Sequence, residues 1–254
     1  MTRKPKAAAP VRRAAERPAK RRPAGSPPAS RQYRRARRDR GADTRAQLID
    51  AALDVFGRLG FEGASTREIA KAAGANLAAI VYHFGGKEAL YIAVAEHIAA
   101  RIISHLGPTL AAVTAPEAIA SPEAARAAMH RLLATFADVI LGEAEAERWA
   151  RFIVREQMQP TAAFDVIYGL TGQAVTNASR LMAAALESAD DPDVWVRVFT
   201  MMGQVLMFRV AQAVVLRRMG WRAIGEKERA QIKRIVIQHL DAILDTAMDQ
   251  GQSR

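Results

Sequence analysis

The sequence predicts an all-α fold in which a small three-helix unit precedes a larger helical domain. Apolar residues recur three and four positions apart in one segment after another, which is the spacing of one face of an amphipathic helix. Glycine, proline and helix-capping residues stand where these segments begin and end. No alternating run of apolar and polar residues is long enough to predict a strand.

The composition fits a folded core and contains no obvious membrane-spanning segment. Hydrophobic residues make up 50% of the 254 residues, and the mean hydropathy is -0.07. A helical span needs about 20 consecutive apolar residues. The longest candidate, residues 198–216, is interrupted by Gln204, Arg209 and Gln212, so we expect no contact with a membrane.

The side chains that metal binding and thiol chemistry need are missing or scattered. The chain has no cysteine, which excludes disulfides, thiolate metal sites and cysteine nucleophiles, and which fits a reducing cytoplasm. No two histidines are spaced four apart, and no carboxylate spacing indicates a metal site. The histidines are His83, His97, His105, His130 and His239. We therefore expect neither a metal nor a cofactor.

Residues 1–40 carry the excess of positive charge. They hold 15 Lys and Arg residues and two acidic ones, a net charge of +13, whereas the remainder has a net charge of -2. Six prolines and dense like charge predict a disordered basic tail over 1–40. Two interpretations stay open: an arm that attracts DNA phosphates whatever their sequence, or an extension with no role of its own. Neither Arg12-Arg13 nor Arg21-Arg22 precedes an apolar stretch, so we expect no export signal.

The first helix of the small unit is predicted over residues 44–59. Asp43 or Thr44 is placed to cap its start, and Gly60 is placed to end it. Its apolar residues fall on one face over about four turns. They are Leu48, Ile49, Ala52, Val55, Phe56 and Leu59.

Two short helices joined by a tight turn follow. Ser65 and Glu68 have the spacing of a capping box, in which the serine side chain accepts from the backbone N–H three residues on. The helix that starts there ends at Gly74, and the next runs from Asn76 to Phe84. Two short helices with a glycine turn are typical of a helix-turn-helix, so residues 41–88 are predicted to form a three-helix DNA-binding domain.

The larger domain, residues 89–254, is predicted to consist of further helices. The first runs from Lys87 to Gly107-Pro108, and the second starts at Pro122. Four more are expected over about 144–158, 161–187, 192–217 and 226–248.

Residues 44–92 carry four motifs in a specific order: Thr66-Arg67-Glu68-Ile69-Ala70, Ala73-Gly74, Tyr82-His83-Phe84 and Lys87-Glu88-Ala89-Leu90-Tyr91. In this order and spacing they closely resemble the TetR family of transcriptional regulators. Arg155-Glu156-Gln157-Met158, Pro160-Thr161 and Phe164-Asp165 resemble the CecR-like branch of that family. The resemblance implies a DNA-binding regulator rather than an enzyme, with a helical ligand-binding and dimerisation domain after the helix-turn-helix.

The segment 76–84 is the expected recognition helix, and its surroundings supply the expected DNA contacts. Such a helix enters a major groove about 12 Å wide and brings its N-terminal residues to the base edges. Ala78 and Ala79 let the backbone approach closely, Tyr82 and His83 are placed for phosphates, and Leu77 has the character to meet a thymine methyl. The full expected set is Thr66, Arg67, Asn76, Leu77, Ala78, Ala79, Tyr82, His83 and Lys87. In one departure from the family pattern, Val81 stands where most relatives carry a tyrosine.

The resemblance also implies partners. The expected assembly is a homodimer on a double-stranded, palindromic operator, in which the helices 192–217 and 226–248 pack against their symmetry mates. The two recognition helices would then lie roughly 34–36 Å apart. The expected protein is a cytoplasmic repressor that joins the nucleoid when bound, and the CecR-like branch suggests an efflux transporter operon as its target.

A small-molecule effector is expected to bind inside helices 122–210. The candidate apolar lining residues are Phe136, Trp149, Phe152, Met201, Met202 and Phe208. Arg155, Gln157 and Gln204 are the candidate polar anchors. Methionine and aromatic residues at helical spacing are more often plain core, and that interpretation stays open.

Two other functions fit the sequence less well. Gly85-Gly86-Lys87 is not a phosphate-binding loop, because Glu88 follows the lysine and no strand precedes it. An all-α enzyme is therefore a distant alternative. An architectural DNA-coating protein would suit the basic tail, but it would not explain a large apolar C-terminal domain.

Overall fold

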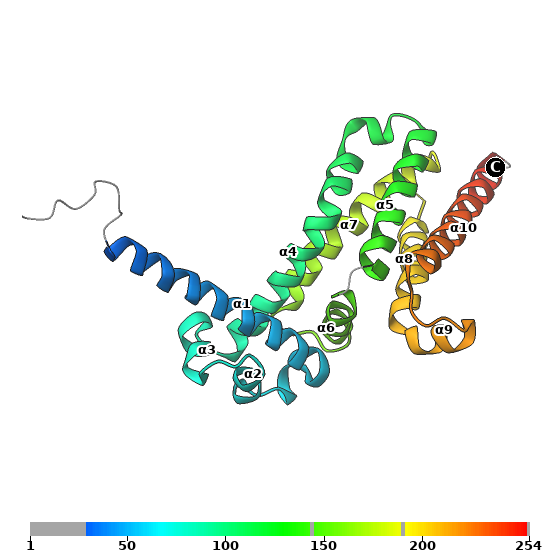
Figure 1. Cartoon of the computed structure of the whole chain (residues 1–254). Coiled ribbons are helices and arrows are strands. Elements are labelled where there is room, and N and C mark those ends of the chain that lie inside the picture. Colours follow the sequence, from blue (N-terminus) through cyan, green and yellow to red (C-terminus); the bar gives the residue numbers. More distant parts are fainter. Residues whose placement is uncertain (1–28, 143–144, 189–190, 253–254) are drawn as a thin grey trace, which may run out of the picture. The chain divides into compact units, whose positions relative to one another are not determined.

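The computed structural model describes residues 29–142, 145–188 and 191–252, and every regular element in those ranges is a helix. The predicted all-α fold is thereby confirmed (Figure 1). The elements are α1 (Ala29–Gly63), α2 (Thr66–Ala72), α3 (Leu77–Phe84), α4 (Lys87–Thr114), the 3-10 helix η1 (Pro116–Ile119), α5 (Pro122–Gly142), α6 (Ala146–Met158), α7 (Phe164–Ala185), α8 (Val194–Val210), α9 (Gln212–Met219) and α10 (Glu226–Gln252).

The first helix begins earlier than the sequence pattern suggested. Residues 1–28 of the expected tail lie outside the described residues, whereas 29–40 are helical and α1 passes through Asp43 and Thr44 without a start there. All six prolines of the tail precede Ala29, and arginine, which dominates 29–40, is a good helix former. The chain divides into two units after Gly41, and the described residues from Ala42 onward form one compact unit.

The three-helix unit closes around one apolar cluster. α1 breaks at Gly60, whose φ of 77° lies in the left-handed region, as the predicted helix end requires. Leu48, Phe56, Ile69 and Ile80 from α1, α2 and α3 are fully buried. The same cluster continues into α4, α6 and the start of α7, so the small unit shares its core with the larger domain.

A second apolar cluster fills the larger domain. It is built from the far half of α4 and from α5, α7, α8 and α10, and Figure 1 shows these helices packed side by side. α4 belongs to both clusters, with Leu90 in the first and Val113 in the second. A single helix therefore runs from beside α3 to the distal end of the larger domain.

α4 does not end at Gly107-Pro108 as predicted, because it continues to Thr114 with Pro108 inside. Proline inside a helix removes one backbone hydrogen bond. Here the helix is held on both sides of Pro108 by tertiary contacts, since Leu106 and Val113 are buried and Thr109 shares a hydrogen bond with Thr135 of α5. Packing therefore overrides the local signal.

By length and mean hydropathy alone, α4 could cross a membrane, and so could α8 and α9 taken as one bent pair; these are the candidates within the described ranges. A core helix of a helical bundle passes the same test. In α4 the apolar residues Leu90, Val94 and Ile98 are fully buried in the protein, and this packing explains its composition.

The helix predicted over 192–217 is two helices. α8 and α9 meet at Ala211 with a bend of 76°. α8 is anchored in the core by Val198, Met201 and Val205, whereas α9 has no buried residue to hold it in line with α8. Apolar residues at helical spacing predict that this stretch is helical, but they do not predict a bend between two consecutive helices.

Candidate nucleic-acid interface and effector cavity

α2 and α3 form the helix-turn-helix, and side-chain caps fix the start of each helix. The Ser65 Oγ accepts from the Glu68 backbone N–H at 3.1 Å, as the capping-box spacing predicted. The Asn76 Oδ1 accepts from the Ala78 backbone N–H at 3.0 Å, which makes Asn76 the cap of α3. Between them Gly74 takes a φ of 63°, so the chain turns tightly enough to bring α3 across α2.

α3 turns one face into the core and the other outward. Ile80 is fully buried, while Asn76, Leu77, Ala78, Val81 and Tyr82 are exposed. Leu77, Ala78 and Val81 lie on one side of the helix because they are spaced by one, three and four residues. The outward face therefore presents apolar side chains at the positions where a recognition helix meets the groove.

The remaining expected DNA contacts surround this face. Thr66 and Arg67 open α2, with Arg67 exposed and Thr66 half-buried. Tyr82 is exposed, and its ring packs edge-on against His83 with the ring centroids 4.9 Å apart. Lys87 is expected to add a charge contact to DNA; its Nζ lies 4.5 Å from the Phe61 ring centroid and donates to the Glu62 carbonyl at 3.4 Å.

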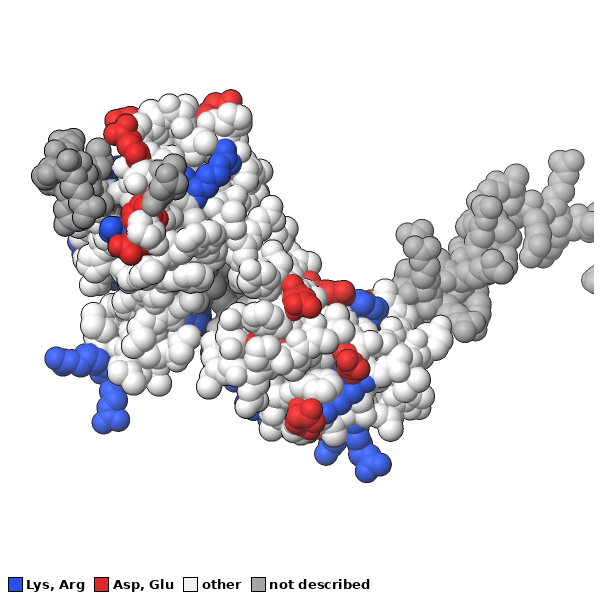
Figure 2. All heavy atoms as spheres, turned by 180° about the vertical axis from the view of Figure 1, so that it is seen from behind, with Lys and Arg blue, Asp and Glu red and all other residues white. Residues whose placement is uncertain are grey.

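The charge of the described residues is mixed. Figure 2 shows Lys and Arg interspersed with Asp and Glu on the face in view, without an extended block of one sign. This pattern agrees with the net charge of -2 outside residues 1–40.

α6 joins the three-helix unit to the larger domain through two arginines. Arg148 donates to the Asp50 carboxylate at 2.8 Å and to the Asp50 carbonyl at 2.6 Å. Arg155 donates to the Gly57 carbonyl at 3.4 Å and to the Arg58 carbonyl at 2.8 Å. These bonds fasten α6 along the second half of α1, so a shift of α6 would move α1.

A buried polar cluster lies beside that junction. The Tyr91 Oη on α4 donates to Glu156 Oε1 on α6 at 2.6 Å. Thr161 donates from its backbone N–H at 3.2 Å and from its hydroxyl at 3.1 Å to the same carboxylate. Burial and the hydrogen bond to Glu156 raise the pKa of Tyr91 well above its ordinary value, so this phenol stays protonated and remains a donor.

His97 on α4 is a second titratable group at this junction whose environment favours the neutral form. Burial lowers the pKa of His97 below its ordinary value. Arg101 and Arg148 act in the same direction as burial, whereas Glu145 and Asp50 act against it. Protonation of His97 is therefore less favourable in the folded chain than in the unfolded chain.

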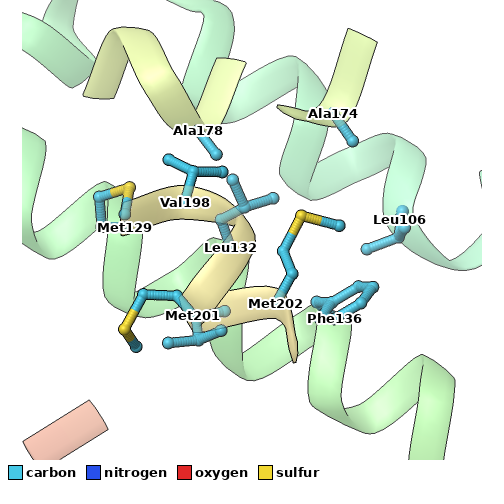
Figure 3. A pocket seen from close by; sticks show the side chains of 10 residues that line it. Leu106, Met129, Leu132, Phe136, Ala174, Ala178, Val198, Met201 and Met202 are labelled. Carbon is cyan, nitrogen blue, oxygen red and sulfur yellow. The ribbon is translucent and has the colours of Figure 1, made fainter. Parts of the chain in front are cut away.

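A small cavity lies within the larger domain, and its whole lining is apolar (Figure 3). Met202 of α8 and Phe136 of α5 reach toward Leu106 of α4, and Ala174 and Ala178 of α7 form the opposite wall. The lining residues are Leu106, Met129, Leu132, Leu133, Phe136, Ala174, Ala178, Val198, Met201 and Met202. The cavity volume is about 50 Å³, well below the roughly 300–1,000 Å³ of typical ligand pockets.

The structure brings together three of the nine expected lining residues, Phe136, Met201 and Met202. Trp149 and Phe152 face the other apolar cluster, near α1 and α4, because α6 packs against the three-helix unit. Phe208 packs on the rim of the second cluster without lining the cavity.

The expected polar anchors also lie elsewhere. Arg155 binds backbone carbonyls of α1, and Gln157 is exposed. Gln204 is hydrogen-bonded to His239 of α10 at 2.8 Å. Arg209, which interrupts the apolar stretch 198–216, donates to the Ile140 carbonyl at 2.8 Å and to the Gln212 side chain at 3.1 Å.

Sequence reasoning passed over several residues that the structure makes prominent. The buried Glu156 follows Trp149 and Phe152 at helical spacing, so a carboxylate on an otherwise apolar stripe was the available signal. Val81 was noted only as a departure and was not expected to contact DNA. Ala174 and Ala178 gave no signal, because small residues on a helix face are common in any core.

Within the described ranges, no group of three or more acidic or histidine side chains is placed to hold a metal ion.

Two family models match the chain. Residues 48–94 match the model of the bacterial regulatory proteins of the tetR family. Residues 125–247 match the model of the C-terminal domain of the HTH-type transcriptional dual regulator CecR. The first match spans the second half of α1 through the start of α4, and the second reaches from α5 to α10.

Known proteins share both the sequence and the fold. The HTH-type transcriptional dual regulator CecR of Shigella flexneri is 36% identical over 210 residues, which cover 81% of this chain and 93% of that protein. A crystal structure of a transcriptional regulator from Pseudomonas aeruginosa PAO1 has a TM-score of 0.58 at 18% identity, covering 81% of this chain and 92% of the other. The regulator FadR of Bacillus subtilis, in complex with stearoyl-CoA, has a TM-score of 0.52 at 14% identity, covering 76% and 95%. The two structures are evidence of a common fold alone.

Proposed function

The chain belongs to the TetR family of bacterial transcriptional regulators, and on that premise we propose that it is a ligand-responsive repressor that binds a palindromic operator as a homodimer. It is a DNA-binding regulator and not an enzyme, as its family and relatives are. The observation that carries the proposal is the capped helix-turn-helix with the exposed face of α3, at the N-terminal end of a chain that matches a regulator along 81% of its length.

The dimer is supported by apolar side chains that the single chain leaves exposed on α8. Trp195 and Phe199 are one turn apart on this helix and are about half exposed, and Gly203 continues their line one turn further. Gln204 of α8 and His239 of α10 are hydrogen-bonded, so α8 and α10 form one surface. Exposed apolar patches of this kind mark protein interfaces, and a second copy would cover this one with the same patch.

The proposed effector site is the cavity among α4, α5, α7 and α8 (Figure 3). Its lining offers no charge and no side-chain hydrogen bond, so it suits an uncharged apolar molecule. Because the cavity is small, such a molecule must displace side chains to enter. Met129, Met201 and Met202 are unbranched and flexible, which makes that rearrangement inexpensive.

The proposed response is linkage between the cavity and the reading head. Leu106 lines the cavity, and Leu90 and Tyr91 on the same helix pack in the core of the three-helix unit. An effector that binds better when α4 is displaced would lower operator affinity. Operator binding would lower effector affinity by the same free energy, because the coupling between two sites is reciprocal. Tyr91, Glu156 and Arg155 are placed to pass this displacement to α6 and α1.

We extend the proposal to a cytoplasmic protein that associates with the nucleoid when bound, and to an efflux transporter operon as its target. The support is the likeness to the CecR-like branch along α5 to α10. That relative is named a dual regulator, so activation of some genes is a second outcome, which the transcript levels of the bound genes with and without the protein would distinguish from repression.

Binding to fragmented DNA from the source organism, at physiological salt, tests the proposal. The full chain is compared with a variant that lacks residues 1–28 and keeps all of α1. Discrete peaks with a shared palindrome in both proteins are expected. Diffuse binding that disappears with residues 1–28 would overturn the proposal and favour an architectural role, since a basic arm binds phosphates whatever the sequence.

A further inference from the structure

The outward face of α3 is apolar at its centre. Leu77 is 44% exposed and Val81 is 64% exposed, and the two are four residues apart on the same side of the helix. Ala78 is exposed beside them. Ile80 on the opposite side is buried in the core, which fixes the direction of this face.

α3 lacks the side chains that usually identify bases by paired hydrogen bonds. Arginine or lysine serves for guanine, and asparagine or glutamine serves for adenine. The helix Leu77–Phe84 contains none of these four residue types. Asn76 precedes it, but its Oδ1 accepts from the Ala78 N–H, so the cap fixes this side chain against the start of α3.

An exposed leucine and valine gain from a groove only where the groove is apolar. In the major groove the apolar group is the C5 methyl of thymine, and cytosine lacks it. We propose that Leu77, Ala78 and Val81 read the operator half-site through thymine methyl groups. The inference rests on the proposed function and adds the chemistry of the bases that are read.

The spacing of the residues limits where these thymines lie. Leu77 and Val81 are separated by about 6 Å along the helix axis, at 1.5 Å per residue. Base pairs follow one another at about 3.4 Å along each strand. The two side chains therefore reach methyl groups within about two base-pair steps, and the centre of each half-site is a short A·T-rich run.

The test begins with selection of sites from random duplex DNA by the full chain. Conserved thymines are expected in each half-site. Each is then replaced by deoxyuridine, which removes the methyl and keeps the base pair. Uridine at a thymine that Leu77 or Val81 covers should weaken binding about fourfold, as expected for one buried methyl group, and uridine in flanking positions should leave it unchanged.

Variants connect each methyl to its side chain. In Leu77→Ala and in Val81→Ala, deoxyuridine should no longer weaken binding at the thymine that the lost side chain covers, and it should still weaken binding at the other thymine. The reason is that the effects of two groups in contact are not additive. Leu59→Ala is the matched control, because Leu59 is a similarly exposed leucine on α1. Thermal melting of each variant, expected to match the parent chain, verifies that the fold is intact.

The outcomes separate the two proposals. A shared palindrome whose affinity is unchanged by uridine at every conserved thymine would overturn the methyl readout alone. Equal uridine effects in all three variants and the parent chain would overturn it too. Selection that yields no shared sequence would overturn the proposed function together with this inference.

Discussion

Tyr91 and Glu156 are 65 residues apart in the sequence, yet the phenol of the first donates to the carboxylate of the second at 2.6 Å inside the protein. Glu156 is only 1% exposed. Thr161 supplies the other donors to this carboxylate. The cluster therefore connects α4, α6 and the start of α7 at the point where the DNA-binding unit meets the larger domain.

Tyr91→Phe should lower the free energy of unfolding by about 1.5–3 kcal/mol, since it removes a hydrogen bond to a buried charged group. Urea denaturation measures the change. Tyr168→Phe is the control, because Tyr168 is 62% exposed and should change stability by less than about 0.5 kcal/mol. Equal effects of the two substitutions would show that the Tyr91 hydroxyl contributes nothing.

Gly60→Ala should destabilise the fold more than Gly220→Ala. Both glycines have positive φ values, 77° and 69°, where a side chain costs about 1–2 kcal/mol. A Cβ at Gly60 would also lie 3.0 Å from an Arg155 guanidinium nitrogen, whereas one at Gly220 would meet no atom within 4 Å. Urea denaturation should show that Gly60→Ala lowers the free energy of unfolding by at least about 1 kcal/mol more than Gly220→Ala does. Part of this difference should come from weaker hydrogen bonds between Arg155 of α6 and α1. Equal losses would mean that Arg155 adapts freely.

Ala178→Met should close the cavity to an uncharged apolar probe such as N-phenyl-1-naphthylamine. Ala178 lines the cavity, and the longer side chain would occupy the space that the probe needs. Fluorescence titration should show at least tenfold weaker binding, while Ala89→Met, at an exposed position of α4, should bind as the parent chain does. Unchanged binding to Ala178→Met would place the apolar site elsewhere.

The sequence was most informative where a local pattern decides the structure. Ser65 and Glu68 predicted a capped helix start, and Gly60 predicted a helix break, because caps and positive φ values depend on a few neighbouring residues. The expected DNA-contact set lies around α3 as its position in the motif implies. Its use in binding stays a prediction.

The sequence was least informative where distant residues decide. Pro108 signalled a helix end, but packing of Leu106 and Val113 carries α4 past it. Trp149 and Phe152 have the same pattern as cavity residues, and only the docking of α6 on α1 shows that they face the other cluster. Arg155 could be recognised as polar, but its acceptors are backbone carbonyls nearly 100 residues away.

His97 should make the junction sensitive to acid. Because burial lowers its pKa in the folded chain, the unfolded chain takes up a proton first as the pH falls below about 6.5. The stability that this group contributes is present above that pH and is lost as the pH falls toward the lowered value. His97→Gln should therefore lose less stability than the parent chain between pH 7 and 5, with urea midpoints as the measurement. Parallel profiles of the two proteins would contradict this role.

Phe199→Glu should separate the proposed dimer. It places a charge in the centre of the exposed apolar surface of α8, where pairing with a second copy would bury that charge without a partner. Sedimentation should then give the 27.7 kDa of one chain in place of twice that mass. Operator affinity should fall at least tenfold, because one chain reaches one half-site and loses the gain from simultaneous binding.

Tyr168→Glu provides the matched control for this substitution. Tyr168 is an aromatic residue on α7 that is 62% exposed, against 60% for Phe199, so the two changes add the same charge to equally exposed rings. The Tyr168 variant should remain a dimer with parental operator affinity. If Phe199→Glu also sedimented as a dimer, the α8 surface would not be the interface. If both variants sedimented as single chains, general charge repulsion rather than loss of a specific apolar contact would explain the dissociation.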